Sequence, residues 1–188
     1  MKSMRIFILI LAIGLVASNQ AFAQDNALPP KWGVEADLLV PFVPTAHIVT
    51  IRASRTIVGY SSDKPGDLVV GVYLRPNVKH DVVEEIDEYL FTIGYRQYLW
   101  KGLHLEGQAD WGYAWGTQNK IDGKDYNNFA MLVEGHLGYR FRFSPTKSKG
   151  FYLNPHVGII HGLITDIGPR GGNSDTFLSA KINLGYTF

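Results

Sequence analysis

Ionisable side chains recur at every second position along several segments of the chain, and they are the residues best suited to chemistry. Between residues 103 and 115, for example, His104, Glu106 and Asp110 alternate with apolar and aromatic residues. Carboxylates, guanidinium groups and imidazoles can form salt bridges, transfer protons or bind metal ions. The residues with this placement, here called the charged set, are Glu35, Asp37, Arg52, Arg96, Glu106, Asp110, Glu134, Arg140, Arg142 and Lys181, accompanied by the histidines His104, His136 and His156.

The same segments offer weak candidates for a metal site. His104 with Glu106, or His136 with Glu134, would place two ligand types on one face of an extended segment. Any alternating polar face produces that spacing, however, because side chains of a strand point to opposite faces in turn. The chain has no cysteine, which excludes cysteine-based metal and redox sites. We therefore expect no bound metal and no cofactor.

Alternation of apolar and polar residues predicts β-strands, and the length of the runs indicates their kind. Along residues 103–115 and 129–143 one face is apolar and rich in aromatic residues, while the other is polar. Strands of globular proteins are usually about 5 or 6 residues long, whereas a strand that crosses a membrane needs about 9 to 11. The long runs favour transmembrane strands, with the charged set facing a lumen and the aromatic face meeting lipid.

Eight strands can be assigned, and an even number is typical of bacterial single-chain barrels. They cover residues 32–40, 47–58, 66–74, 89–99, 103–115, 129–143, 151–164 and 178–188. The connections at 61–65, 100–102, 144–149 and 41–45 are short, and those at 75–88, 116–127 and 165–175 are longer and rich in Gly, Asn and Asp. Apart from the connection at 41–45, this matches short periplasmic turns and long external loops. We predict an all-β fold, an eight-stranded antiparallel up-and-down transmembrane β-barrel with both termini in the periplasm.

The N-terminal residues predict export. A basic start precedes an apolar run over residues 6–16, and small residues at Ala21 and Ala23 suit cleavage by a signal peptidase. The run is only about half of the ~20 residues that a membrane-spanning helix needs. We expect residues 1–23 to be a cleaved signal peptide and residues 24–188 to form one barrel domain.

Charge and composition narrow the range of partners. The formal net charge of +1 gives no basic field of the kind that binds nucleic acid, so no nucleic-acid partner is expected. Trp100 and Trp115 fall at opposite ends of predicted strands, where interfacial aromatic residues are typical. The acidic residues 81–88 are most simply a solvated loop, although they could also bind divalent ions that bridge lipopolysaccharide.

The last predicted strand ends in Tyr186 and Phe188. A terminal aromatic residue on an alternating strand resembles the signal by which the barrel-assembly machinery recognises its substrates. With these features, residues 24–188 resemble the small eight-stranded outer-membrane barrels of the OmpA-transmembrane and OmpX type, and are similar to uncharacterised barrels of the Bacteroidetes. The resemblance implies an outer-membrane location and contact with outer-membrane lipid and lipopolysaccharide, but no particular activity.

Three functions are compatible with a charged lumen. Eight strands enclose a space that side chains can just fill, and buried charges must pair because an isolated one is costly. This favours a salt-bridge network that fills the lumen of a non-enzymatic barrel with a structural or surface-interaction role. The alternatives are a narrow channel or small-ligand-binding barrel and, less favoured, a lipid A-modifying enzyme. A soluble lipocalin-like barrel would require the two faces to be reversed.

The enzyme alternative finds little support in the sequence. Lipid A deacylases built on such barrels carry His and Ser two positions apart on one strand, and no histidine here is followed by serine at that spacing. Ser179 could face His156 or His161 only from a different strand, and a triad needs all its members within hydrogen-bond reach. We expect no catalytic residues and no enzymatic activity, while the partner of the external loops cannot be identified from the sequence.

Overall fold

The computed structural model describes residues 32–43, 46–59, 64–79, 81–144, 149–164 and 176–188. Strands dominate it, and a short 3-10 turn, η1 (Val40–Phe42), follows the first strand. The strands are β1 (Trp32–Asp37), β2 (Val49–Val58), β3 (Gly66–Lys79), β4 (Glu85–Trp100), β5 (Leu103–Thr117), β6 (Tyr126–Tyr139), β7 (Phe141–Arg142), β8 (Gly150–Ile164) and β9 (Thr176–Thr187). No helix among the described residues is long and apolar enough to cross a membrane.

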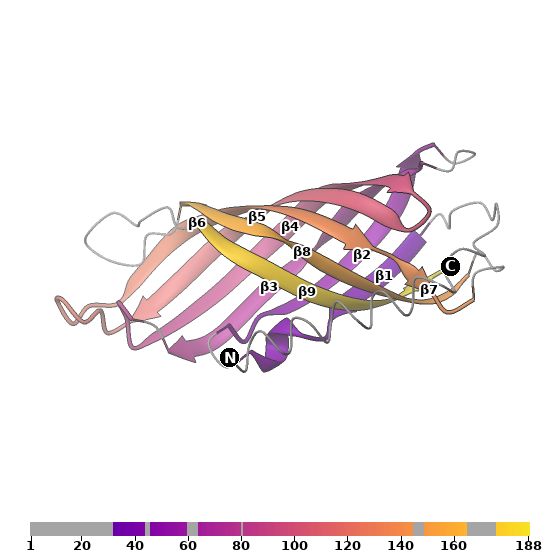
Figure 1. Cartoon of the computed structure of the whole chain (residues 1–188). Helices are drawn as coiled ribbons and strands as arrows, with labels where there is room; N and C mark the ends of the chain where they lie inside the picture. The colour runs from indigo at the N-terminus through magenta and orange to yellow at the C-terminus, as the bar shows by residue number, and fades with distance from the viewer. Residues whose placement is uncertain (1–31, 44–45, 60–63, 80, 145–148, 165–175) are drawn as a thin grey trace.

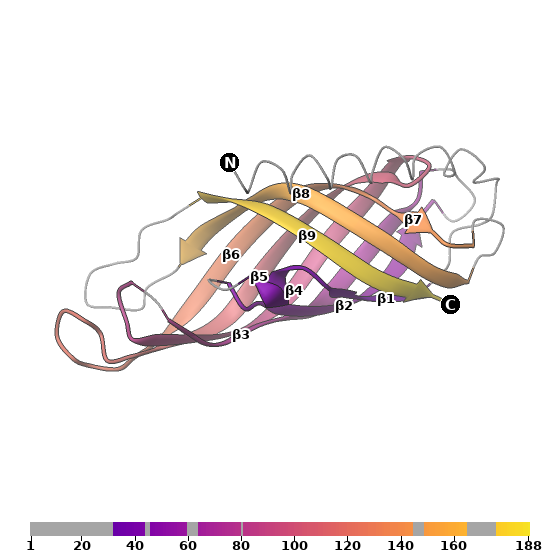
Figure 2. The same cartoon turned by 60° about the horizontal axis from the view of Figure 1, so that its bottom comes forward.

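The strands form a closed antiparallel barrel (Figures 1 and 2). From β1 to β6, and from β8 to β9, each strand pairs with the next one in the chain, and β1 pairs with β9 to close the cylinder, with Glu35 opposite Gly185. β6 and β7 both pair with β8 and together form one wall strand, so the barrel has eight strands. The predicted all-β, eight-stranded up-and-down fold is confirmed.

The interruption between β6 and β7 has a local cause in β8. Gly138 pairs with His156 and Phe141 pairs with Leu153, so the register is the same on both sides of the break. Pro155 lies between these two pairs and has no backbone N–H to donate. On the other side of the strand, the pairing with β5 is kept, because Arg140 donates its backbone N–H to the carbonyl of Gly102 at 2.9 Å. The ladder is broken without a change in strand direction.

The two ends of the barrel differ. At one end, the terminal end, β1 begins, β9 finishes and residues 101–102 turn the chain from β4 into β5. The other end, the loop end, carries η1, residues 81–84 before β4 and residues 118–125 between β5 and β6. Residues 1–23 and 165–175, for which a signal peptide and an external loop are predicted, lie outside the described residues.

The loop end shows where the predicted strand bounds were wrong. Residues 75–88 were expected to be a loop, but most of them continue the β3–β4 hairpin, with Lys79 opposite Glu85. Pro76 and Asn77, whose φ is 49°, interrupt the alternation of inward and outward residues, and the pairing register shifts between Arg75 and Val78. A bulge adds one unpaired residue to a strand. Inward residues therefore fall on odd positions before the bulge and on even positions after it, so the alternation cannot be followed across it in the sequence.

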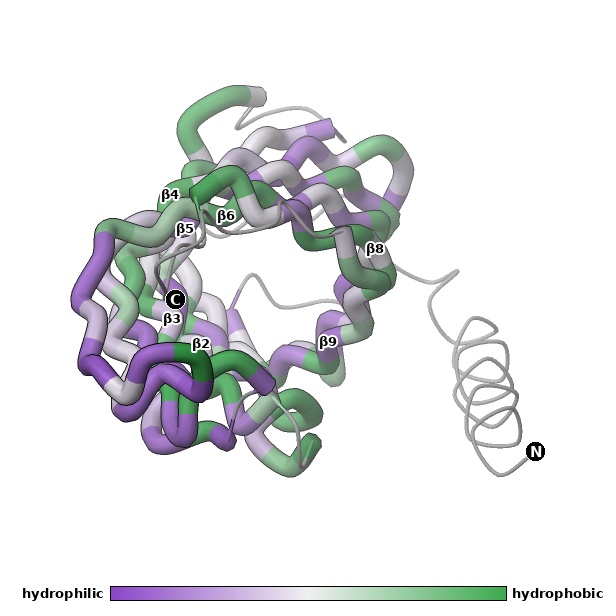
Figure 3. Tube along the Cα trace, turned by 90° about the vertical axis from the view of Figure 1, so that its left-hand side faces the viewer, coloured by the Kyte–Doolittle hydropathy of each residue, from purple (hydrophilic) through white to green (hydrophobic). Residues whose placement is uncertain are grey.

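Hydrophilic and hydrophobic residues alternate along the strands (Figure 3), and over much of the barrel the polar residues are buried inside while the apolar residues are exposed outside. Along β5, the inward residues His104, Glu106 and Asp110 are at most 3% exposed, while Leu105 is 51% exposed. The outward face of the other strands is similarly apolar, for instance at Ile159, which is also 51% exposed. This is the opposite of a lipocalin-like barrel, whose apolar face points inward.

Candidate functional site in the barrel lumen

Four members of the charged set form a closed ring of ion pairs across the lumen. Glu35 on β1 forms ion pairs with Arg52 on β2 and with Arg96 on β4, each at 2.6 Å. Glu106 on β5 accepts from the same two arginines, from Arg96 Nε at 2.6 Å and from Arg52 Nη1. All four side chains are at most 3% exposed. The ring has no net charge and joins four of the eight wall strands.

Neutral donors and acceptors complete this ring. Tyr152 on β8 donates its hydroxyl to Glu35 Oε2 at 2.8 Å, and Arg52 Nη1 also donates to Gln108 Oε1 at 2.8 Å. Charge-assisted hydrogen bonds of this kind are the stronger ones in proteins. The carboxylate of Glu35 is therefore tied to strands on both sides of the barrel.

A second cluster lies nearer the terminal end and is centred on Arg140. Its guanidinium lies 4.4 Å from the ring centroid of Tyr152 and 5.0 Å from that of Tyr98, which is cation–π geometry. It also pairs with Asp67 Oδ2 at 3.4 Å, and Thr56 donates to the other oxygen of that carboxylate at 2.8 Å. Arg140 thereby bridges the interrupted β6–β7 strand to β3.

The remaining charged residues do not join the ring. Lys181 on β9 forms an ion pair with Glu134 on β6, and Asp110 accepts from Thr92. Asp37 turns to the backbone: its Oδ1 accepts from the N–H of Leu39 at 2.7 Å and holds the start of η1. Arg142, on β7, is only partly buried. The charged set is therefore a central ring with smaller clusters around it, of which Asp110 is connected to the ring through Gln108 and Arg140 through Tyr152.

The three histidines of the set lie side by side in the lumen. The ring centroids of His104 and His156 are 5.2 Å apart, and those of His136 and His156 are 5.8 Å apart. Each is at most 3% exposed. They come from β5, β6 and β8, which are adjacent in the wall.

Inward-facing glycines make room for the large lumen side chains. The cross-strand pairs are Arg52 with Gly71, His104 with Gly138, His136 with Gly158, and Tyr152 with Gly185. A Cβ added at Gly138 would lie 2.5 Å from His104 Nε2, a distance that real Cβ atoms essentially never show. The high glycine content thus follows from filling a narrow lumen with long side chains.

The lumen is apolar towards the loop end. A buried cluster there consists of Tyr73, Val78, Val83, Ile86, Leu90, Ala114, Ala130 and Leu132, with Ile48 and Ile160 packed against it. Val83 belongs to the β3–β4 connection and is fully buried, lying against Gly116 of β5. Residues 81–88 are therefore not simply a solvated acidic loop, because Val83 and Ile86 are buried.

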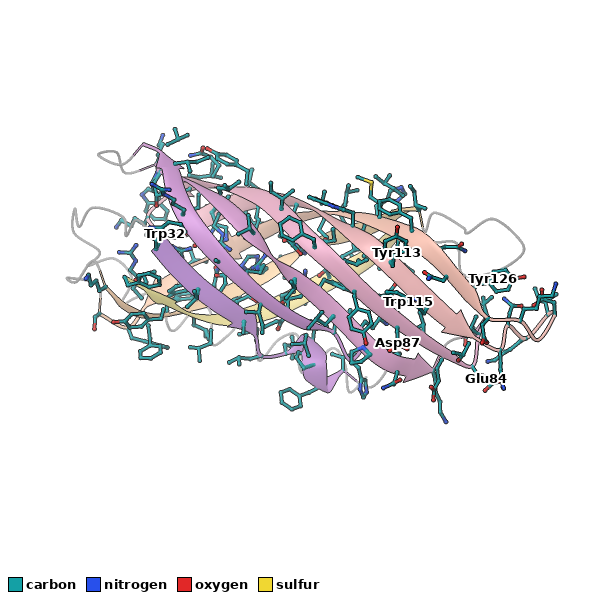
Figure 4. All side chains as sticks on the ribbon, turned by 180° about the vertical axis from the view of Figure 1, so that it is seen from behind. Trp32, Glu84, Asp87, Tyr113, Trp115 and Tyr126 are labelled. Atoms are coloured by element: carbon teal, nitrogen blue, oxygen red, sulfur yellow. The ribbon has the colours of Figure 1, made fainter. Side chains whose placement is uncertain are left out.

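The outer wall carries aromatic residues near both ends. Figure 4 shows Trp32 at one end of the barrel and Tyr113 and Trp115 towards the other. At the terminal end, Phe151 packs edge-to-face on Tyr186 with ring centroids 4.9 Å apart. Phe188 is 49% exposed, and its N–H donates to the carbonyl of Trp32 at 3.0 Å. The two predicted assembly-signal residues thus lie on the outward face of the strand that closes the barrel.

A shallow groove of about 540 Å³ crosses the outer wall. It is lined by Tyr95, Gln97, Leu105, Glu106, Gly107, Gly135, His136, Leu137, Val157, Gly158 and Ile159. Gly107 and Gly135 pair in register, and a Cβ added at either would meet nothing within 4 Å. The lining is mainly apolar and contains no serine, so it offers contact with an apolar chain.

The register also places the serine considered above. Ser179 lies opposite Gly158, whereas His161 pairs with Thr176, whose hydroxyl is 2.8 Å from His161 Nδ1. His156 lies opposite Lys181. Cross-strand pairing therefore brings neither histidine directly opposite Ser179.

Several lumen residues were missed by the sequence interpretation. Asp67, Tyr98 and Tyr152 are all at most 5% exposed and take part in the Arg140 cluster. Alternation with Asn154 and His156 could have placed Tyr152 inside. Asp67 follows a glycine at the start of its strand, where alternation is too short to assign a face.

Comparisons of the chain with protein-family models, with curated proteins and with solved structures found no match. The lumen and the outer wall are therefore interpreted from their own chemistry.

Proposed function

We propose that the chain is a non-enzymatic outer-membrane barrel of the small OmpA-transmembrane and OmpX type, with a structural or surface-interaction role. The observation that carries this proposal is the distribution of polarity: buried ion pairs fill the lumen, and half-exposed apolar side chains cover the wall. Such an outer surface is unfavourable in water and favourable in lipid. Its partners are outer-membrane lipid and lipopolysaccharide.

Two segments of the sequence support export and assembly as parts of this proposal. Residues 1–23 have the pattern of a signal peptide, and Tyr186 and Phe188 present an aromatic edge at the closing strand. We infer that the barrel-assembly machinery recognises this edge before β9 pairs with β1. The role of Phe188 in closure is supported by its backbone hydrogen bond to Trp32.

The loop end is suited to interaction because two of its connections hold each other in place. Glu84 donates its backbone N–H to Thr117 O at 2.9 Å, and Lys120 donates to Val82 O at 3.0 Å. Loops fixed in this way lose little conformational entropy when they bind a partner. Acidic side chains such as Glu84 and Asp87 project from this end (Figure 4), where they can bind divalent ions that bridge lipopolysaccharide.

Fractionation combined with heat-modifiability tests the proposal. The protein is expressed from the full chain in a Gram-negative host, extracted from separated membranes, and run on a gel with and without boiling. We expect it in the outer-membrane fraction with a faster band when unboiled, and Phe188→Ala should reduce the amount of that band. A soluble periplasmic protein without a mobility shift would contradict the proposal.

The narrow-channel alternative is favoured by one observation, the charged residues that run through the terminal half of the lumen. The apolar cluster at the loop end and the ion-pair ring both oppose it, because side chains from opposite walls meet there. Purified protein in a planar lipid bilayer should give no steady conductance. Stable conductance steps from the unmodified chain would establish the channel alternative instead.

A further inference from the structure

Two histidines and a glutamate converge at one place in the lumen. His104 and Glu106 lie on β5 and His156 on β8, and one ligand atom from each lies within 4.8 Å of the others. All three side chains are at most 3% exposed. Imidazole nitrogens and a carboxylate oxygen form a donor set that binds zinc and related ions. We propose that these three residues bind a divalent transition-metal ion of the zinc class.

The environment of His104 prepares it as a ligand. Its Nδ1 lies 3.0 Å from the carbonyl oxygen of Gly102, so Nδ1 carries the proton and donates it. The lone pair is then on Nε2, which is buried and has no hydrogen-bond partner. Metal-binding histidines usually donate their second N–H to a carbonyl or carboxylate, which fixes the ring and its tautomer.

The second histidine, His156, lies beside Asn183, and each of the two side chains has one buried polar atom without a hydrogen-bond partner. Its Nε2 lies 3.3 Å from the side-chain amide nitrogen of Asn183, while His156 Nδ1 and Asn183 Oδ1 are both buried without a partner. A half-turn of the Asn183 amide lets Nε2–H donate to Oδ1 and leaves the Nδ1 lone pair for a metal. The turned amide then satisfies Asn183 Oδ1, and a bound ion would satisfy His156 Nδ1, which otherwise costs free energy as a buried polar atom without a partner.

Glu106 is held as an ionised ligand by the ion-pair ring. Its two oxygens accept from Arg52 and Arg96, and each oxygen of a carboxylate has a further lone pair that can face a metal. The ring itself contributes no net charge. Apart from Glu88, which pairs with the partly buried Arg75, six buried carboxylates oppose four buried cationic groups, and Arg142 is partly buried: Glu35, Asp37, Asp67, Glu106, Asp110 and Glu134 against Arg52, Arg96, Arg140 and Lys181. The lumen is therefore able to accept a cation.

Three protein ligands leave one position of a tetrahedral ion open to water. Gly138 supports this arrangement, since any larger residue there would occupy the space beside His104 Nε2. The sequence analysis expected no metal because it considered only pairs of ligands within one strand, such as His104 with Glu106. The third ligand, His156, comes from β8, two places from β5 in the wall.

Metal content after refolding tests the site. The chain is unfolded in urea with a chelator, refolded into detergent with Zn²⁺ present, desalted, and its zinc measured by mass spectrometry. We expect one ion per barrel, and affinity at least about tenfold weaker in His104→Gln and in His156→Gln. His161→Gln is the matched control, because His161 lies on β8 outside the cluster, and it should retain the ion. The heat-modifiable gel band shows that each variant is folded.

A second measurement keeps the proposal testable if a variant fails to fold. Co²⁺ replaces Zn²⁺ in the unmodified protein, and its visible absorption reports the number of ligands. We expect the intense bands of a four-coordinate ion. The proposal is overturned if the unmodified barrel binds no metal, if both histidine variants retain it, if His161→Gln loses it, or if Co²⁺ gives only a weak six-coordinate spectrum.

Discussion

The two halves of the lumen are built from the same strands but filled by different chemistry. Towards the terminal end, Glu35, Arg52, Arg96 and Glu106 meet in pairs whose partners are fixed by direction and charge. Towards the loop end, apolar residues around Leu90 pack without such pairing. The stability of the polar half therefore depends on specific ion-pair partners, whereas the stability of the apolar half depends on the volume of its side chains. Mutations in the two halves should therefore fail in different ways.

The largest effect is expected in the polar half. Arg96→Met leaves Glu35 and Glu106 with Arg52 as their only guanidinium partner, and breaking a buried ion pair costs about 3–5 kcal/mol. Urea unfolding of the refolded barrel, followed by tryptophan fluorescence, measures the loss in free energy of unfolding. Arg55→Met, on the outer wall beside Trp32, is the control and should have little effect.

A double variant separates charge from volume in the same ring. Arg96→Met combined with Glu106→Leu leaves Arg52 and Glu35 as a balanced pair, so the double variant should be more stable than Arg96→Met alone. If it is less stable, pairing is not what holds this half together.

The apolar half should respond to lost volume. Leu90 is 2% exposed within the cluster, and replacing a buried leucine by alanine costs about 2–5 kcal/mol. Leu90→Met, which keeps the volume, should cost less than about 1.5 kcal/mol. The same urea titration measures both, and equal losses in the two variants would contradict packing as the cause.

Glycine positions give a smaller and sharper contrast. Gly138→Ala places a Cβ 2.5 Å from His104 Nε2, and overpacking of this kind typically costs about 1–3 kcal/mol. Gly135→Ala, on the outward face of the same strand, meets nothing within 4 Å and should be neutral or slightly stabilising. Similar losses in free energy of unfolding at both positions would contradict the space beside His104 as the reason for glycine at position 138.

The smallest effect lies in the β5–β6 loop, outside both halves. Tyr126 donates its hydroxyl to Asp122 at 2.6 Å, and this bond lowers the pKa of the Asp122 carboxyl. The bond favours the ionised form, so its contribution is present above the ordinary pKa and is lost as the pH falls through the lowered value. Tyr126→Phe should raise the pKa of Asp122 towards its ordinary value in an NMR titration, and an unchanged pKa would rule out this cause.

The fold class followed from alternation because one face of every strand is apolar and the other polar. What could not be predicted was which inward residues meet, since this depends on register between strands far apart in the sequence. Arg52 and Glu106 contact each other across the lumen, and Arg140 finds Asp67. No spacing along the chain encodes those distances.

The apolar half was missed for a different reason. Leu90 and Leu132 face inward. In an alternating sequence, a single apolar residue on an otherwise polar face reads as an exception and does not indicate an apolar cluster. The bulge near Pro76 then shifted the phase of β3 and hid Val78 from the pattern. Alternation therefore predicts strands and faces well, and fails where the lumen changes from polar to apolar.

The central claim is that the apolar face meets lipid and the polar face is sealed inside. The chain has no cysteine, so single thiols can be introduced at Leu105, which faces outward, and at Thr92, which is 1% exposed in the lumen. Each variant is refolded into lipid vesicles and treated with a membrane-soluble or a charged, water-soluble maleimide. We predict that the Leu105→Cys thiol reacts only with the membrane-soluble reagent, and that the Thr92→Cys thiol reacts with neither until the barrel is unfolded. Rapid modification of the Leu105→Cys thiol by the charged reagent in intact vesicles would contradict the account.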